Sequence, residues 1–188
     1  MVKVAGTHFH AQATCMTDLS SPSKAPAFNQ CPRNFERHAY ERTFRVSRPI
    51  YTVWTWLNRT ETFTKGQLPP YRVEFIPDRF EVGVLTNHHG PALNFSGMIT
   101  KMEAPCYREL EYFYGSYALS FRWIRPTRLE FWLDEHGDET VVKLRVTSWV
   151  RRGFSWFWTT AQRLFWPIFG LALASIPKNP TQTLGVTS

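Results

Sequence analysis

Two tyrosines carry the side chains best placed for chemistry in this sequence. Tyr112 and Tyr114 are two residues apart in the strand-like segment RELEYFY, so they share one face with Leu110. Their hydroxyls can donate hydrogen bonds to a ligand carbonyl, or transfer protons if their pKa is shifted. The simpler interpretation makes both of them core aromatic residues whose hydroxyls reach the rim of the core.

Histidines and arginines offer further polar candidates. His88 and His89 are adjacent in NHHGP, a segment that predicts a turn, and a histidine near the mouth of a cavity can shuttle protons. Exposed turn histidines without such a role are more common. Arg122, Arg125 and Arg128 cluster in FRWIRPTR and can hold a carboxylate or phosphate, although arginines on an edge strand often have no specific role.

Motifs for other chemistries are missing from the sequence. It contains no nucleophile elbow, glycine-rich phosphate loop or HExxH motif. His8 and His10 alternate near the start of the chain, but two histidines without a third ligand do not define a metal site. We therefore expect no metal and no cofactor.

The composition favours one domain that does not bind nucleic acid. A chain of 188 residues can form a full hydrophobic core, and its aromatic content of 16% suits either a large core or a ligand cavity. The net charge is +7, but the basic residues are spread singly, whereas nucleic-acid binders gather them on one element. Attraction to an anionic membrane or to an acidic protein explains the charge equally well.

The cysteines and the first residues predict a cytoplasmic location. Cys15, Cys31 and Cys106 are an odd number with no CxxC pair, which argues against a disulfide framework and favours a reducing compartment. The opening residues lack the continuous apolar run of a secretory signal.

The chain divides into three parts by composition and periodicity. Residues 1–34 are rich in Ser, Pro, Ala and Thr and are expected to form a poorly ordered arm. Residues 35–176 show the periodic patterns of a folded domain, and residues 177–188 are expected to be a flexible tail.

The domain begins with a strand and two helices. HAYERTFRVS has strand period, because its aromatic residues and Val46 share one face. Pro49 then marks the start of a helix from Ile50 to about Asn58, and a second short helix is expected to end at Gly66.

A series of strands follows, with reversals predicted at Pro77, in NHHGP and around Gly137. Several of them alternate apolar and polar residues, which is typical of an antiparallel sheet covered on one side. The expected strands are YRVEFI, RFEVGVLT, ALNFSGMITKME, RELEYFYGSYALSFRWI, TRLEFWLD and TVVKLRVTSWV.

The chain closes with one long helix, from about Arg151 to Ile176, that could cross a membrane or cover the sheet. A charge at Arg163 costs about 2.5 to 3.5 kcal/mol in a bilayer on insertion scales, and the helix is two-faced, which favours a lid over the sheet. Trp156 and Trp166 fall on the polar side, so peripheral contact with a membrane remains an alternative. The residues predicted to face inward are Phe154, Phe157, Trp158, Ala161, Leu164, Phe165, Ile168, Phe169 and Ala172.

The order of elements, β-α-α-β₆-α, and the segment SRPIYTVWTWL resemble the START/Bet v 1-like superfamily, also called SRPBCC or polyketide cyclase-like proteins. The resemblance covers about Phe35 to Ile176 and implies an α+β helix-grip fold, in which a curved antiparallel sheet wraps around a long C-terminal helix. The superfamily includes lipid and hormone carriers, aromatase/cyclases, coenzyme Q-binding proteins and oxygenase domains. The iron site of the oxygenases needs two histidines and a carboxylate, and no suitable spacing is present.

Two functions follow from this resemblance. The first is the binding of a hydrophobic small molecule or lipid in an internal cavity between the sheet and the C-terminal helix, without chemistry. The second is a cyclase- or dehydratase-like enzyme, in which cavity tyrosines and a histidine move protons on a polyketide-like substrate. The residues expected to line the cavity are Trp54, Val73, Phe75, Phe95, Tyr112, Tyr114, Phe131, Leu144, Trp158 and Phe165.

Overall fold

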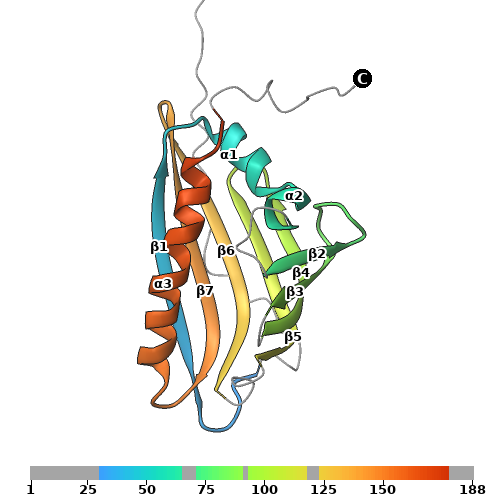
Figure 1. Cartoon of the computed structure of the whole chain (residues 1–188), viewed down its shortest axis with the longest axis vertical. Helices are drawn as coiled ribbons and strands as arrows, with labels where there is room; N and C mark the ends of the chain where they lie inside the picture. Colours follow the sequence, from blue (N-terminus) through green and yellow to red (C-terminus); the bar gives the residue numbers. More distant parts are fainter. Residues whose placement is uncertain (1–29, 65–70, 91–92, 118–122, 178–188) are drawn as a thin grey trace, which may run out of the picture.

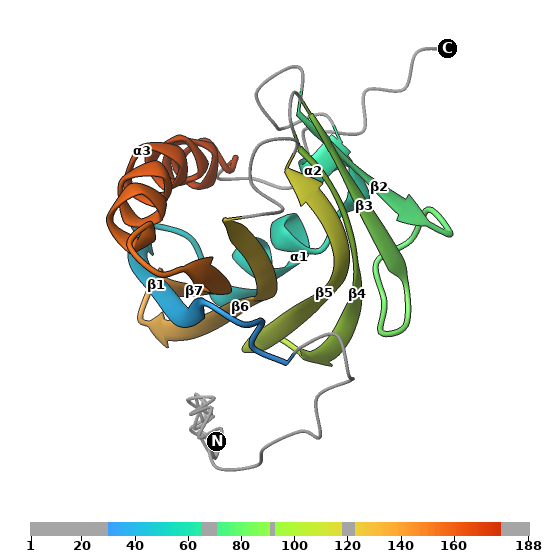
Figure 2. The same cartoon turned by 90° about the horizontal axis from the view of Figure 1, so that it is seen from below.

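The computed structural model describes residues 30–64, 71–90, 93–117 and 123–177. Its elements follow the predicted order, with a sheet of seven antiparallel strands, two short helices after the first strand and one long helix at the end. The sheet is strongly curved, and α3 lies at one end of the curve, where it packs against β1 and β7 (Figures 1 and 2). The bounds are β1 Phe35–Val46, α1 Ile50–Leu57, α2 Thr60–Thr64, β2 Arg72–Ile76, β3 Leu85–Gly90, β4 Leu93–Glu103, β5 Tyr107–Tyr117, β6 Ile124–His136, β7 Glu139–Arg151 and α3 Ser155–Ala174.

The sheet runs in the order β1-β7-β6-β5-β4-β3-β2, so the first strand joins the last one. Apolar residues alternate with polar ones along the strands, as predicted. On β7, Val142 and Leu144 have no solvent exposure on the concave face, whereas Lys143 and Arg145 reach Glu41 of β1 on the convex face. The alternation therefore buries the concave face and leaves the convex face polar.

The helices α1 and α2 lie across one end of the sheet (Figure 1). α1 begins directly after Pro49, as expected, and it buries Ile50, Val53 and Leu57 at helical spacing against the sheet. These residues join the main core, which continues along the concave face from β1 to β2.

The placement of the histidine pair corrects the sequence prediction. His88 and His89 lie within β3, not in a turn, and most of RFEVGVLT is not a strand. Gly83 has φ +90°, a conformation that favours glycine, and its N–H donates to Ile99 O at 2.8 Å. The chain is thus held in a turn before it enters β3, and the strand falls later than the alternation indicates.

The faces of α3 also differ from the prediction. Its buried side chains are Trp158, Gln162, Trp166 and Leu173, and this side contacts β1 and β7. Four of the nine apolar residues predicted to face inward are exposed instead, namely Phe157, Leu164, Ile168 and Phe165, the last at 49%. The buried side contains a glutamine because Trp166 Nε1 donates to Gln162 Oε1 at 2.6 Å, so both polar groups are satisfied. No helix in the described ranges is long and apolar enough to cross a bilayer.

Two of the cysteines lie in the described part of the chain. Cys31 is free and exposed, whereas Cys106 is buried and disulfide-bonded. The odd cysteine count therefore does not exclude a disulfide, because pairing depends on proximity in the fold.

Candidate ligand-binding site

Most of the residues predicted to line a cavity lie together on the concave face. The main core cluster contains Val73, Phe75, Phe95, Tyr112, Phe131 and Leu144, each less than 9% exposed, and Trp54 packs against it. They come from α1, β2, β4, β5, β6 and β7, so the curvature of the sheet brings together segments far apart in sequence.

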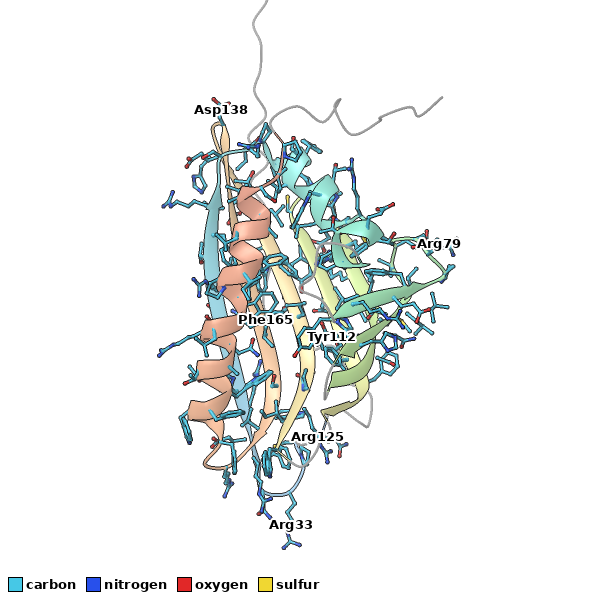
Figure 3. The ribbon with its side chains drawn as sticks, viewed as in Figure 1. Arg33, Arg79, Tyr112, Arg125, Asp138 and Phe165 are labelled. Atoms are coloured by element: carbon cyan, nitrogen blue, oxygen red, sulfur yellow. The ribbon has the colours of Figure 1, made fainter. Side chains whose placement is uncertain are left out.

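The remaining predicted residues are placed differently. Trp158 belongs to a separate small cluster with Ile124 and Val150, where its Nε1 donates to Ser148 Oγ at 3.1 Å. Phe165 is half-exposed on α3, and Figure 3 shows it at about the same height in the molecule as Tyr112. The side chain of Tyr114 lies outside the described residues.

An aromatic cluster on β3, β4 and β5 contains the histidine that was expected in a turn. The rings of His88 and Phe95 stack with centroids 4.3 Å apart and planes inclined by 8°. Tyr112 meets both rings edge-on, at 5.3 Å from His88 and 4.7 Å from Phe95. Gly97 makes this arrangement possible, because a Cβ there would lie 2.7 Å from Tyr112 Cδ1.

Two polar atoms on β3 lie beside this cluster without a hydrogen-bond partner among the described residues. Thr86 is completely buried, and its Oγ1 is unpaired. His88 is two residues further along the same face, and its Nε2 is shielded from solvent and also unpaired, although the residue as a whole is partly exposed. Burial, with a smaller contribution from neighbouring His89, lowers the pKa of His88 to about 3. The imidazole is therefore neutral at physiological pH and can either donate or accept one hydrogen bond at Nε2.

A buried arginine occupies the other end of β5. The guanidinium of Arg108 lies 4.5 Å from the ring centroid of Phe131, 4.9 Å from that of Phe80 and 5.1 Å from that of Phe63. Its Nη1 donates to Leu57 O, at the C-terminal end of α1, where a positive charge is favourable. Burial lowers the pKa of Arg108 to about 9, so the group stays charged at neutral pH. We assign it a structural role, because it anchors α1 to the sheet within an aromatic cage.

The alternation of residues along β5 indicates that Arg108 points inward, although the sequence prediction did not use this signal. In RELEYFY, Arg108 alternates with Glu109 and so shares its face with Leu110 and Tyr112, which were expected to point inward. Thr86 shares its face with Val84 in the predicted strand RFEVGVLT, so alternation could have placed it inward as well. His88 lacked this signal, because it was assigned to a turn.

The predicted arginine cluster does not form an anion site in the described part of the chain. Arg128 lies on the convex face, where it pairs with Glu109 at 3.3 Å and Glu111 at 2.6 Å. Arg125 lies over the ring of Phe35 at 5.2 Å, and Arg122 falls outside the described residues. Among the described residues, no three His, Cys, Asp or Glu side chains gather as metal ligands.

The comparisons with solved structures show the fold of the chain. A truncated norcoclaurine synthase from Thalictrum flavum matches with a TM-score of 0.57 and 14% identity, over 75% of this chain and 93% of that one. A START superfamily protein from Mycobacterium smegmatis matches with a TM-score of 0.57 and 10% identity, over 73% of this chain and 94% of that one. No family model and no curated protein sequence matches the chain. The chain therefore has the helix-grip fold, as its resemblance implied.

Proposed function

We propose that this protein binds a hydrophobic small molecule or lipid between the concave face of the sheet and α3. One observation carries the proposal: Thr86 Oγ1 and His88 Nε2 lie unpaired beside the aromatic cluster of His88, Phe95 and Tyr112, on a face whose other buried residues are mostly apolar. A buried polar atom without a partner destabilises a fold by about 1–3 kcal/mol, so two on one face point to a ligand that supplies the partners.

The chemistry of these two atoms defines the polar part of the ligand. Because His88 is neutral, it suits an uncharged hydroxyl or carbonyl better than a carboxylate. The stacked rings of Phe95 and His88, with Tyr112 edge-on, suit a flat or apolar ligand body. The ligand is therefore an amphipathic molecule with a large apolar part and a neutral polar group.

The alternative is a cyclase- or dehydratase-like enzyme, and the convergence of His88 and Tyr112 favours it. General acid–base catalysis works best when the pKa of the catalytic group lies near the working pH. Burial holds the pKa of His88 at about 3, which makes it a weak base at neutral pH. Binding without chemistry therefore agrees better with the electrostatics of this site.

A displacement experiment tests the binding function. A neutral dye whose fluorescence rises in apolar surroundings is titrated onto the full chain and then displaced by either 2-naphthol or naphthalene, which differ by one hydroxyl. We expect one-site dye binding and a preference for 2-naphthol of roughly twofold to tenfold, equivalent to one hydrogen bond.

Two variants at neighbouring positions control this experiment. His88→Phe keeps the stacking on Phe95 but removes Nε2, so the preference for 2-naphthol should become weaker. His89→Phe changes a side chain that faces Glu74 on the other side of the strand and should keep the preference. Failure of the folded wild type to bind the dye, or an equal preference in His88→Phe, would contradict the proposal.

A further inference from the structure

The outward side of α3 carries large apolar side chains that nothing in the described part of the chain covers. Trp156 is 70% exposed, Leu164 72% and Leu171 73%, and Phe157 and Ile168 are more than 40% exposed. These five residues, termed here the outer face of α3, lie on one side of the helix because their spacings follow the helical repeat. Exposed apolar patches on this scale mark sites of protein or membrane interaction.

The fold itself does not require this surface to be apolar. α3 packs against β1 and β7 through its opposite side, which carries Trp158, Gln162 and Trp166. Figures 1 and 2 show the helix at one margin of the molecule, with its other side uncovered by the described strands and helices. Polar residues on the outer face would leave the packing of α3 unchanged.

The charged residues of α3 and of the segment just before it are all basic, although Glu36 of β1 accepts a hydrogen bond from Ser155 Oγ at the start of the helix. Arg151 and Arg152 are exposed just before the helix, and Arg163 is exposed within it. The α3 segment contains no aspartate or glutamate, and the net charge of the whole chain is +7. We infer that the outer face of α3 attaches the protein to an anionic membrane surface, with the helix lying in the plane of the lipid headgroups.

An amphipathic helix of this kind binds a membrane through both its apolar side chains and its basic ones. Its apolar side chains enter the boundary between headgroups and acyl chains, where tryptophan is favoured. The arginines attract anionic headgroups, and each contributes about 1 kcal/mol near the surface.

A second copy of the chain is a less suitable partner for the outer face of α3, because of the charges on the helix. Arg163 lies close to the middle of α3, which runs from Ser155 to Ala174. If two copies packed through antiparallel α3 helices related by a twofold axis, each Arg163 would face the other. This repulsion argues against self-association through the outer face of α3, whereas an anionic membrane complements it.

Vesicle sedimentation tests the inference on the full chain. Vesicles of phosphatidylcholine mixed with phosphatidylserine are compared with vesicles of phosphatidylcholine alone. We expect the protein to sediment with the anionic vesicles and to be released as salt is added, since screening shortens the reach of surface charges to about 8 Å at physiological ionic strength.

Substitutions separate the apolar and the ionic contributions. Trp156→Ser, Leu164→Ser and Leu171→Ser together should weaken binding at least tenfold, because each apolar side chain contributes roughly 1.5–3 kcal/mol when buried. Arg163→Gln should weaken binding about fivefold and reduce its salt dependence. Tyr51→Ser with Val82→Ser changes exposed apolar residues elsewhere and should leave binding unchanged. The single variant Leu171→Ser repeats the test if the triple variant does not fold.

The outcomes distinguish this inference from the ligand-binding proposal. The triple variant should still bind the neutral dye, because its substitutions lie outside the concave face. Equal sedimentation of wild type and triple variant, or of wild type with neutral and anionic vesicles, would overturn the inference. Concentration-dependent dimers that the triple variant abolishes would overturn it too, and would assign the outer face of α3 to a second copy of the chain.

Discussion

The two halves of the concave core differ in whether their buried polar groups have hydrogen-bond partners. On α3 and β7, Gln162 and Trp166 bond to each other, Trp158 bonds to Ser148, and Thr140 Oγ1 donates to Arg48 O. On β3 and β5, the buried atoms Thr86 Oγ1, His88 Nε2 and Arg108 Nε have no partner among the described residues. The first is called the α3 half and the second the β3–β5 half.

This difference bears on the stability of each half and on the ligand-binding proposal. A satisfied buried polar group fixes a unique packing, whereas an unsatisfied one destabilises the fold unless something else binds it. His38 is an exception in the α3 half, since its Nε2 lies 2.8 Å from Thr159 Oγ1 but its Nδ1 is unpaired. The α3 half thus pairs most of its buried polar groups, while the β3–β5 half contains the unpaired atoms on which the ligand-binding proposal rests.

The largest effect is expected from a truncation in the α3 half. Leu144 on β7 has no solvent exposure, so Leu144→Ala removes buried methyl groups and leaves a cavity. Such changes lower the free energy of unfolding by about 2–5 kcal/mol. Urea unfolding followed by circular dichroism measures this loss. Leu164→Ala, at a position that is 72% exposed, is the matched control and should change stability by less than about 0.5 kcal/mol.

The second largest effect on stability is expected from loss of the hydrogen bond between two side chains of α3. Gln162→Leu leaves Trp166 Nε1 buried without an acceptor and should lower the free energy of unfolding by about 1–3 kcal/mol. In a Trp166→Phe background the same substitution should have a smaller effect, because no donor is left unpaired. An equal loss in both backgrounds would show that this bond does not stabilise the α3 half.

The sequence predicted the sheet better than it predicted the faces of α3. Strand alternation needs only local information, and it identified the inward positions of β1, β6 and β7 and the order of elements. On α3, apolar residues cover more than half of the circumference, so hydropathy alone does not identify the buried side. Trp166 and Gln162 are buried because they satisfy each other, and this depends on the geometry of the pair.

The candidate site was partly predictable for the same reason. Phe95, Tyr112 and Phe131 follow from alternation, and Arg108 could have been found in the same way. The position of His88 could not have been found in this way. The start of β3 depends on the hydrogen bond from Gly83 N–H to Ile99 O on another strand. A contact between distant segments decides that turn, and no local pattern encodes it.

Acid should destabilise the folded protein through His88. The usual pKa of histidine is 6.5, and burial lowers the pKa of His88 in the fold to about 3 because it disfavours the charged ring. Between these values the unfolded state binds a proton that the folded state does not, so the free energy of unfolding falls as pH drops from 6.5 towards 3. One such group contributes at most about 1.4 kcal/mol per pH unit. The pKa of His38 is also lowered by burial and adds to the trend.

His88→Phe isolates the contribution of this histidine. The variant should lose less stability per pH unit in the same window, as measured by urea unfolding across the acid range. His38 remains in this variant, so part of the slope should persist. If the slopes of wild type and variant coincide, His88 is not buried as a neutral ring and the contrast between the halves is weaker.

The smallest effect compares two threonines that are both completely buried. Thr86 lies in the β3–β5 half without a partner, whereas Thr140 in the α3 half donates to Arg48 O at 2.7 Å. Valine has nearly the shape of threonine but no hydroxyl. Thr140→Val should therefore lower the free energy of unfolding by about 0.5–1.5 kcal/mol, the net value of one hydrogen bond, and leave the carbonyl of Arg48 without this donor. Thr86→Val removes a buried hydroxyl that has no partner, so stability should stay the same or rise slightly. Its effect should appear in binding instead, as a weaker preference for 2-naphthol over naphthalene. An equal loss of stability in both variants would show that the hydroxyl of Thr86 is satisfied in the folded chain, and the two halves would then not differ in the way that supports a ligand site.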